Sequence, residues 1–475
     1  MAATPEHLSA DFPTAALPLL QDAQLRGNVR HATDVIQGKR SLRVSEMPDW
    51  QFLRDAGQHI RAHALTYLDM YLEQFEQRCV AAGGRVHWAR DATEANRMVI
   101  DLARNETGRV LKIKSMTTEE TGLNRALEAA GIEPIETDLA ELIVQLGHDR
   151  PSHIVVPALH KSRDQVRELF AHTMNLPHLG NRPEDLTEAA RKYLRHRFLS
   201  TPVAISGANF LIAETGGVCI VESEGNGRMC LTLPRALITV AGIDKILPRF
   251  RDLEVMLQLL PRSATGERMN PYNSIWTGVH PGDGPEAFHV VLLDNRRTEV
   301  LRDPEARETL YCIRCGACQN VCPVYRQTGG HAYNSVYAGP IGAILTPQLA
   351  SMTRGRSLPF ASTLCGACYE VCPVKINIPE VLIHLRGKVV AHKARSARGF
   401  NAERIAMRVM QWILMSEKRL KLAQRFGRIV QRPFVRDGWI RRLPGVLDGW
   451  TRTRDLQPLP PQSFREWFEK RGQHE

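Results

Sequence analysis

Seven of the ten cysteines lie in one short stretch of the chain, between Cys312 and Cys372. The first four follow the pattern C-x2-C-x2-C-x3-C and are followed directly by Pro323. Three thiolates at this spacing can hold three corners of one iron–sulfur cluster, and in two-cluster ferredoxins the fourth cysteine ligates the other cluster. Zinc sites instead use four ligands in total. The pattern therefore predicts iron–sulfur clusters rather than zinc.

A second copy of the motif follows after a long insert: residues 315–324 and 365–374 are identical at eight of ten positions. Exchange of the last cysteine between the copies predicts one complete ligand set for a [4Fe-4S] cluster, consisting of Cys312, Cys315, Cys318 and Cys372. The second set has three thiolates and is expected to hold a [4Fe-4S] or a [3Fe-4S] cluster, with Cys322, Cys365 and Cys368 as ligands. Ser362 stands where an eighth cysteine would lie, and it is either a fourth ligand or a turn residue.

The clustering of the cysteines and the lack of long apolar runs predict the cellular compartment and the absence of a membrane span. Clustered cysteines in a large chain that lacks a secretory signal are typical of a reducing compartment, so we expect a cytoplasmic protein. No apolar run reaches the roughly 20 residues that span a bilayer. The remaining cysteines, Cys79, Cys219 and Cys230, are predicted to be small buried apolar side chains.

The elements that must position these residues change character along the chain. Residues 66–299 alternate helical segments with short apolar runs, which predicts βαβ units and a mostly parallel sheet. The expected strands are Arg85–Trp88, Arg109–Ile113, Ile132–Glu136, His153–Pro157, Ala204–Phe210, Gly217–Glu222, Ala236–Val240 and Val290–Leu293.

Four parts are expected. Residues 1–65 form a helical extension on the surface of the next domain, 66–299 the α/β domain, 300–390 an α-helical two-cluster ferredoxin, and 391–475 a basic C-terminal region. Helical character is expected over Ala402–Val430. Phe464–Phe468 is predicted to anchor the last, more extended stretch.

The positive charge is confined to the end of the chain. Residues 386–475 hold 21 Lys and Arg against 8 Asp and Glu, whereas the first 385 residues hold 41 against 43. This distribution argues against a general nucleic-acid binder and favours one basic surface that meets an acidic partner or an anionic membrane surface.

Three long strings of the sequence carry a resemblance to a known family. Residues 114–146, 206–228 and 364–386 are similar to lactate utilisation protein B, and the similarity extends over nearly the whole chain. The resemblance implies a lactate-utilisation (LUD) domain, related in fold to sugar-phosphate isomerases and CoA transferases, followed by a ferredoxin with two iron–sulfur clusters. It also implies a cytoplasmic subunit that acts with two other lactate utilisation proteins in the oxidation of L-lactate to pyruvate.

The α/β part offers candidate site residues of its own. The turn Ser223–Gly227 resembles a turn of some CoA transferases in which a glutamate is the nucleophile, although a glycine is inserted here after Glu224. Glu224 is therefore a weak catalytic candidate, against the simpler interpretation of a charged turn. Lys114, Glu222 and Arg228 are weak cofactor-binding candidates, and Glu214 is expected to join Glu222 and Glu224 in a pocket with three carboxylates.

Other polar residues near strand ends are expected to be structural. Lys112, Lys114 and Ser115 precede a helix and could hold an anion, but a capped helix with solvated lysines is favoured. His153, His160 and Lys161 are expected to be solvated loop residues. No G-x-G-x-x-G or Walker A pattern supports a nucleotide.

Two functions are compatible with these observations. The first is an electron-transfer subunit of a lactate-oxidising complex, with the dehydrogenase chemistry on a partner. The second is a self-sufficient oxidoreductase, or an acyl-transfer or isomerase-type enzyme, whose α/β domain carries the active site. The explicit redox ligands and the lack of a hydride-acceptor motif favour the first.

Overall fold

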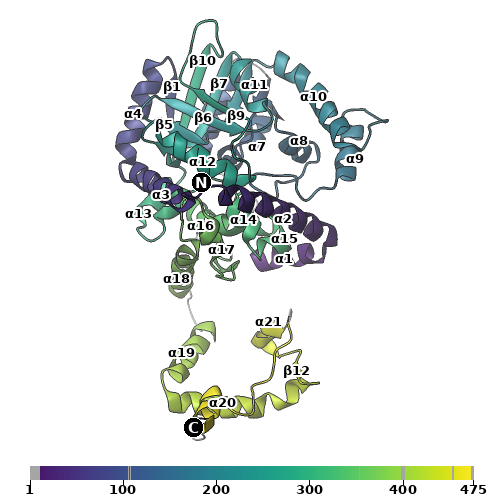
Figure 1. Ribbon diagram of the computed structural model, residues 1–475, viewed down its shortest axis with the longest axis vertical. Helices are drawn as coiled ribbons and strands as arrows, with labels where there is room; N and C mark the ends of the chain where they lie inside the picture. Colours follow the sequence, from purple (N-terminus) through teal and green to yellow (C-terminus); the bar gives the residue numbers. More distant parts are fainter. Residues whose placement is uncertain are drawn as a thin grey trace. The chain divides into compact units, whose positions relative to one another are not determined.

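The structure is a computed structural model that describes residues 11–104, 106, 108–351, 353–396, 402–451 and 454–471. These residues belong to two units, Met1–His392 and Lys393–Glu475, each of which is described by itself. Figure 1 shows the order of the elements along the chain.

The first unit contains the α/β part, the cysteine motifs and the N-terminal helices. Its strands are β1 (Arg85–Ala89), β2 (Arg109–Lys112), β3 (Glu133–Glu136), β4 (Val203–Ser206), β5 (Phe210–Ile212), β6 (Gly217–Glu222), β7 (Ala236–Gly242), β8 (Ile246–Leu247), β9 (Tyr272–Trp276) and β10 (Ala287–Leu293). Its helices are α1 (Phe12–Gln21), α2 (Ala23–Ser45), α3 (Trp50–Thr66), α4 (Leu68–Ala81), α5 (Ala92–Arg104), α6 (Met116–Thr121), α7 (Leu123–Ala129), α8 (Leu139–Leu146), α9 (Arg163–Thr173), α10 (Pro183–Ser200), α11 (Asn226–Thr232), α12 (Asp252–Ala264), α13 (Arg297–Arg302), α14 (Ala317–Val321), α15 (Tyr325–Thr328), α16 (Gly339–Leu349), α17 (Ala367–Val371) and the start of α18 (Ile378–Ser396).

The main sheet has six strands in the order β1-β10-β7-β4-β2-β3, and all its pairings are parallel, as the alternation of helices and strands predicts. Side chains on a strand alternate between faces. In β10, Val291 and Leu293 therefore enter one buried cluster with α5 and α7, while Val290 and Leu292 enter another with α4 and α10. The sheet is covered on both faces, which explains its apolar strands.

A second sheet was not anticipated. It has the order β8-β5-β6-β9, with β5 and β9 antiparallel to β6 and β8 parallel to β5. The expected strand Ala204–Phe210 is divided between the two sheets, because the chain leaves the main sheet after Ser206 and enters the second at Phe210. The three separate cysteines are buried, as predicted.

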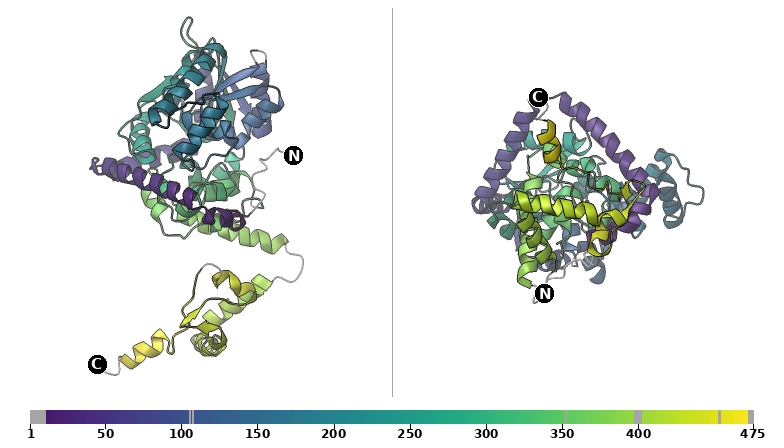
Figure 2. Two further views of the ribbon diagram at one scale, coloured as in Figure 1. Left: turned by 90° about the vertical axis from the view of Figure 1, so that its right-hand side faces the viewer. Right: turned by 90° about the horizontal axis from the view of Figure 1, so that it is seen from below.

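The N-terminal helices do more than cover the α/β part. In Figures 1 and 2, α2 runs alongside the cysteine motifs, and it contacts α12, α14 and α15. The Gln37 side chain donates to the carbonyl of Asn320 at 2.6 Å, and Arg54 Nε donates to the carbonyl of Cys372 at 2.9 Å. The N-terminal helices therefore pack on the cysteine region in addition to the α/β part, where they contact α12.

The segment His153–Pro157 is not a strand, contrary to prediction. The Nδ1 atom of His153 accepts hydrogen bonds from the backbone N–H groups of Val155 and Val156, both at 3.0 Å. These local bonds bend the chain, and the bend packs on the first cysteine motif, since Nε2 of His153 lies 3.1 Å from Asn320 Oδ1.

The second unit consists of short helices and one two-stranded pair: α19 (Ala402–Leu414), α20 (Glu417–Val430), β11 (Val435–Arg436), β12 (Trp439–Ile440), α21 (Asp448–Thr451) and α22 (Phe464–Arg471). The predicted helical stretch is thus two helices. Phe464 and Phe468 are 72% and 61% exposed, so they do not anchor the last stretch to the described residues of this unit, and their role as an anchor stays a prediction.

Candidate functional site

The predicted first ligand set surrounds one buried cavity. The cysteines that border it are Cys312, Cys315, Cys318 and Cys372. The second residue of each motif copy, Gly316 and Gly366, has a φ of 74° and 85° directly before α14 and α17. A residue with a side chain rarely adopts this left-handed conformation. The glycines therefore let both loops turn sharply around the sulfur atoms.

Backbone N–H groups point at these sulfur atoms. The N–H of Arg314 donates to Cys312 Sγ at 3.4 Å, and the N–H of Ile376 donates to Cys372 Sγ at 3.3 Å. Burial raises the pKa of the Cys372 thiol to about 11. Without a metal Cys372 is therefore a neutral thiol, and a metal would have to displace its proton.

Buried arginines supply positive charge beside the thiols. Arg314 is 8% exposed; its Nη2 lies 3.6 Å from Asp244 Oδ2 and its guanidinium stacks over Tyr337. Arg61 is 1% exposed and donates to the backbone carbonyls of Ile246 and Leu310 at 2.8 and 2.9 Å. Soft sulfur donors, N–H groups and buried cations form an environment that fits an anionic iron–sulfur cluster.

The second set, Cys322, Cys365 and Cys368, lies in a more open environment. Cys322 and Cys368 are buried, but Cys365 is exposed. Burial raises the pKa of Cys368 to about 12, with further contributions from the nearby Cys322 and Cys365. Ser362 Oγ accepts a hydrogen bond from the N–H of Leu364 at 3.1 Å, which is the geometry of a turn residue.

The candidate residues of the α/β part only partly converge. Lys114, Glu222 and Glu224 border one cavity of 380 Å³, but Glu214 does not and instead accepts from the N–H of Phe250 at 2.7 Å. The predicted pocket with three carboxylates is therefore wrong. Arg228 is exposed and lies over the Tyr272 ring, away from this cavity's lining.

The carboxylate of Glu222 stabilises the loop that follows it. It accepts from the N–H groups of Glu224 and Gly225 at 2.8 and 2.6 Å. Glu224 Oε2 accepts from the N–H of Leu139 at 2.9 Å. Partial burial and the neighbouring Asp138 and Glu222 raise the pKa of Glu224. Glu222 is thus occupied structurally, while Glu224 remains at the cavity.

Lys112 is not solvated, contrary to prediction. It is 1% exposed and pairs with Glu119 at 2.9 Å and Glu136 at 2.6 Å. Burial alone would lower the pKa of this lysine, but the two carboxylates raise it above its usual range. Ser115 caps α6 by accepting from the N–H of Thr118, as predicted.

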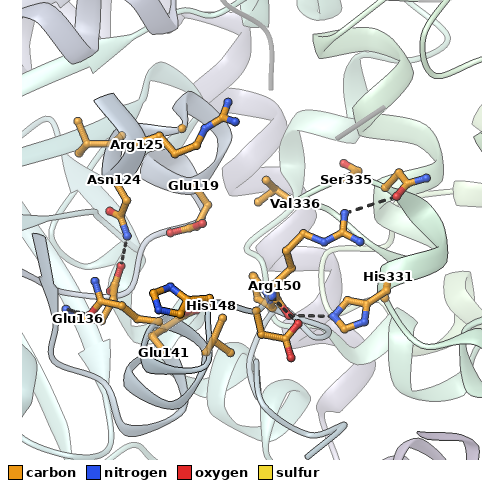
Figure 3. A pocket seen from close by; sticks show the side chains of 18 of the residues that line it. Glu119, Asn124, Arg125, Glu136, Glu141, His148, Arg150, His331, Ser335 and Val336 are labelled. Carbon is orange, nitrogen blue, oxygen red and sulfur yellow. Dashed lines mark hydrogen bonds between the residues drawn. The ribbon is translucent and has the colours of Figure 1, made fainter. Parts of the chain in front are cut away.

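The α/β part borders another cavity, with a volume of 410 Å³, which was not anticipated from the sequence and is called the second cavity below. Figure 3 shows Glu119, Glu136 and Glu141 on one side of it and Arg150 and His331 on the other. It adjoins the 380 Å³ cavity, since Glu141 of the second cavity lies 3.3 Å from Lys114 of the 380 Å³ cavity.

The predicted solvated residues near Pro157 are also mostly buried. His153 and His160 are 2% and 8% exposed. His160 Nε2 lies 2.9 Å from Asp149 Oδ2, which also pairs with Lys161 at 2.5 Å. Asp149, His160 and His331 could hold a cation, but the ammonium of Lys161 competes for the same carboxylate.

Family models cover most of the chain. A LUD domain matches residues 72–293, a 4Fe-4S dicluster domain matches 308–376, and the C-terminal domain of lactate utilisation protein B matches 385–473. No helix among the described residues is long and apolar enough to cross a bilayer.

Curated relatives are similar over almost their full lengths. The lactate utilization protein B of Bacillus licheniformis is 42% identical over 458 residues, which is 95% of each chain. A protein of Escherichia coli K12 named uncharacterized electron transport protein YkgF is 40% identical over 97% of each chain. A solved DUF162 family protein from Deinococcus radiodurans is 13% identical, covers 48% of this chain and 98% of its own, and has a TM-score of 0.27, which is too low to support an argument.

Proposed function

The chain belongs to the lactate utilisation protein B family, and we propose that it is the iron–sulfur electron-transfer subunit of a multi-subunit system that oxidises L-lactate to pyruvate. The observation that carries the proposal is the buried cavity bordered by Cys312, Cys315, Cys318 and Cys372. Packing in a hydrophobic core does not require cysteines at this spacing, so the spacing favours ligands of a cluster over buried apolar side chains.

In this proposal the crossed ligand sets hold the two clusters. The first set holds a [4Fe-4S] cluster, and Cys322, Cys365 and Cys368 hold a [4Fe-4S] or [3Fe-4S] cluster. The bound clusters supply one-electron acceptors and donors. We also retain the division into residues 1–65, 66–299, 300–390 and 391–475.

The chain's own residues set the properties of the first site. The N–H donors to Cys312 and Cys372 hold the sulfurs in position, and apolar side chains such as Ile154 and Ile341 border the cavity and limit water. Arg314 offsets negative charge. Hydrogen bonds, burial and charge are the features by which a protein tunes the potential of a cluster.

A self-sufficient oxidoreductase is the second candidate. It is favoured by the position of Glu224, a carboxylate with a raised pKa that borders the 380 Å³ cavity together with Lys114. Such a group could serve as a general base. We favour the electron-transfer subunit, because the sequence provides seven clustered cysteines as redox ligands but no hydride-acceptor motif.

The test combines the purified chain with its two partner proteins under anaerobic conditions. L-lactate should bleach the cluster absorbance of the complete mixture, while the chain alone should show little lactate oxidation with an artificial acceptor. The partners without this chain are the control. Robust turnover by the chain alone, abolished by Glu224→Gln with iron content unchanged, would favour the self-sufficient enzyme instead.

The basic second unit is proposed to dock on an acidic surface of a partner protein in the cytoplasm. By itself it leaves large apolar side chains exposed, such as Trp412 at 60% and Phe426 at 67%. Lys418 and Arg425 are exposed, whereas Arg428 pairs with Glu466 at 3.2 Å. Exposed charge beside exposed apolar surface is typical of an interaction site.

Charge reversal tests this docking. Lys418→Glu with Arg425→Glu should weaken co-purification with the partners and remove its salt dependence, because the steering charges are inverted. Lys192→Glu, on exposed α10, is the matched control. Unchanged association of the double variant would contradict an acidic partner, and loss of binding to anionic vesicles alone would point to a membrane surface.

A further inference from the structure

We propose that the 380 Å³ cavity of the α/β part binds the anionic group, a carboxylate or a phosphate, of a small organic molecule directly beside the first cysteine set. The proposal rests on the proposed function, because it names the ligand class of the site from which that cysteine set would receive electrons. It assigns the binding group to Lys114, Lys245 and Arg314, of which the last two were not singled out by sequence.

The topology brings these cations to one edge of the sheet. Strands β7, β4 and β2 are neighbours and all parallel, so their carboxyl ends meet at the same edge. Lys114 follows β2, Gly207 follows β4 and Lys245 follows β7, and all three border the cavity. Open parallel sheets bind their ligands in the crevice outside these carboxyl ends.

Each of the three cations has unused hydrogen-bonding capacity. Within the part of the chain that the structure describes, Lys114 Nζ and Arg314 Nη1 are buried atoms without a hydrogen-bond partner. Lys245 is 7% exposed, and no hydrogen bond or ion pair of its ammonium is found among the described residues. A buried donor left unpaired costs about 1–3 kcal/mol, and more when it is charged. Two such donors, with the largely buried Lys245 side chain beside them, favour a ligand that accepts hydrogen bonds and carries negative charge.

Nearby carboxylates offset the charge of this group only in part, although Asp138 and Glu224 also border the cavity. Glu141 lies 3.3 Å from Lys114 but borders the second cavity. Asp244 pairs with Arg297 at 2.5 Å and lies 3.6 Å from Arg314, so a single carboxylate is shared between two arginines. The carboxylate of Glu222 is occupied by backbone N–H groups of its own loop.

The cavity adjoins the site of the first cysteine set. Ile154 and Arg314 border both cavities, so a ligand bound here would be separated from the cysteine site by one layer of side chains. Lys245, in contrast, borders only the α/β cavity. Arg314 can serve both sites and Lys245 also lies near Cys312, so Lys114 is the residue that best distinguishes ligand binding from support of the cysteines.

The size of the cavity leaves two sources for the anion. A volume of 380 Å³ exceeds what a three-carbon acid fills and lies in the range of ordinary cofactor pockets. Apolar side chains such as Ile113, Ile220 and Leu260 cover part of its wall. The anion is therefore either the carboxylate of the substrate or the phosphate of a larger cofactor with an apolar body.

The experiment is anaerobic calorimetric titration of the full-length, iron-loaded chain without its partners. L-lactate and pyruvate probe the carboxylate source, and flavin mononucleotide probes the phosphate source. Binding of at least one probe is expected, and Lys245→Met should raise its Kd about tenfold, since a charge-assisted hydrogen bond contributes that much. Lys114→Met should act in the same direction.

Controls separate this result from damage to the fold. Asp244 keeps its Arg297 partner in Lys245→Met, and iron content with circular dichroism verifies that the variant is loaded and folded. Lys192→Met, an exposed lysine of α10, should leave every Kd unchanged. As a second readout, the bound probe should shift the electron paramagnetic resonance signal of the reduced first cluster, because Arg314 borders both cavities.

Two outcomes would overturn the proposal. One is the absence of binding by all three probes, and the other is a Kd that Lys245→Met and Lys114→Met leave unchanged. Either result would leave the electron-transfer function intact if lactate still reduces the clusters in the complete mixture. Failure of that reduction with binding preserved would instead contradict the proposed function alone.

Discussion

The two copies of the cysteine motif are nearly identical in sequence but have different surroundings. A Cβ atom at Gly316 would lie 3.2 Å from both His153 and Val155, whereas a Cβ atom at Gly366 would meet nothing within 4 Å. Within the first copy Gln319 is fully buried, and the corresponding Tyr369 of the second copy is 41% exposed.

This difference shows that two nearly identical motifs can lie in different surroundings, which would allow the proposed clusters to have different roles. The first copy is enclosed by the α/β part, where a ligand could deliver electrons. The second copy opens to solvent, where another protein could collect them. The comparison therefore suggests a direction, from the α/β cavity through the first site to the second, and it can be tested by substitution.

The largest effect is expected for the crossed cysteine. Cys372→Ser should remove about four of about seven to eight irons and abolish the signal of the first cluster, although Cys372 belongs to the second copy. Cys365→Ser, the control, should affect only the second cluster. Iron analysis with electron paramagnetic resonance measures both. Loss of only the second signal in Cys372→Ser would contradict the crossed assignment.

The next effect concerns the charge network that holds the first copy against the α/β part. Arg297 is 1% exposed and pairs with Glu120 at 2.9 Å and Asp244 at 2.5 Å. Arg297→Met should lower the free energy of unfolding by about 3–5 kcal/mol, because it removes the closest ion-pair partner of two buried carboxylates. Chemical denaturation measures this.

An exposed ion pair provides the control for that variant. Arg191 pairs with Glu188, and both side chains are largely solvated. Arg191→Met should change the free energy of unfolding by less than about 1 kcal/mol. Equal losses for the two arginine variants would show that the buried network does not hold the first copy.

The next effect is spread over several pH units. Burial, with a contribution from Lys114, lowers the pKa of His153 to about 3. Between pH 6.5 and 3 the unfolded state therefore binds a proton that the folded state does not bind. The free energy of unfolding is highest above pH 6.5 and falls by about 1.4 kcal/mol per pH unit between pH 6.5 and 3. His153→Gln should flatten this slope in denaturation curves, while exposed His178→Gln should not. An identical slope in both variants would contradict the role of His153.

The smallest predicted effect is the difference in stability between alanine variants of Gly316 and Gly366. Gly366→Ala should cost about 1 kcal/mol because of its positive φ alone. Gly316→Ala should cost roughly 0.5–1 kcal/mol more, because its Cβ also presses on His153 and Val155. Thermal unfolding and iron retention of the pair measure the difference, and equal losses would mean that the first copy is not tightly enclosed.

The sequence predicts the parts of this molecule that are encoded by local spacing. The cysteine sets follow from positions within the two motifs, and the parallel sheet follows from the alternation of apolar runs with helices. Arg314 could have been noticed, since it stands between Cys312 and Cys315.

The burial of Lys245 and Lys112 depends on tertiary structure, and the local sequence pattern predicts neither this burial nor the bend at His153. Lys245 looks like an ordinary charged residue after a strand, and its burial becomes visible only when the cysteine region covers the edge of the sheet. Lys112 was expected to be solvated because its partner Glu136 lies on another strand. The His153 segment has strand-like composition, but hydrogen bonds to its own imidazole override that propensity.

The exposure of Cys365 has a consequence for the handling of this protein in air. Molecular oxygen and peroxide reach a thiolate ligand at the surface before they reach ligands in the interior. Oxidative damage should therefore begin at the second site and leave the first intact for longer. If electrons follow the proposed path, a preparation exposed briefly to air would still accept an electron from the α/β side but could no longer pass it to an acceptor through the second site.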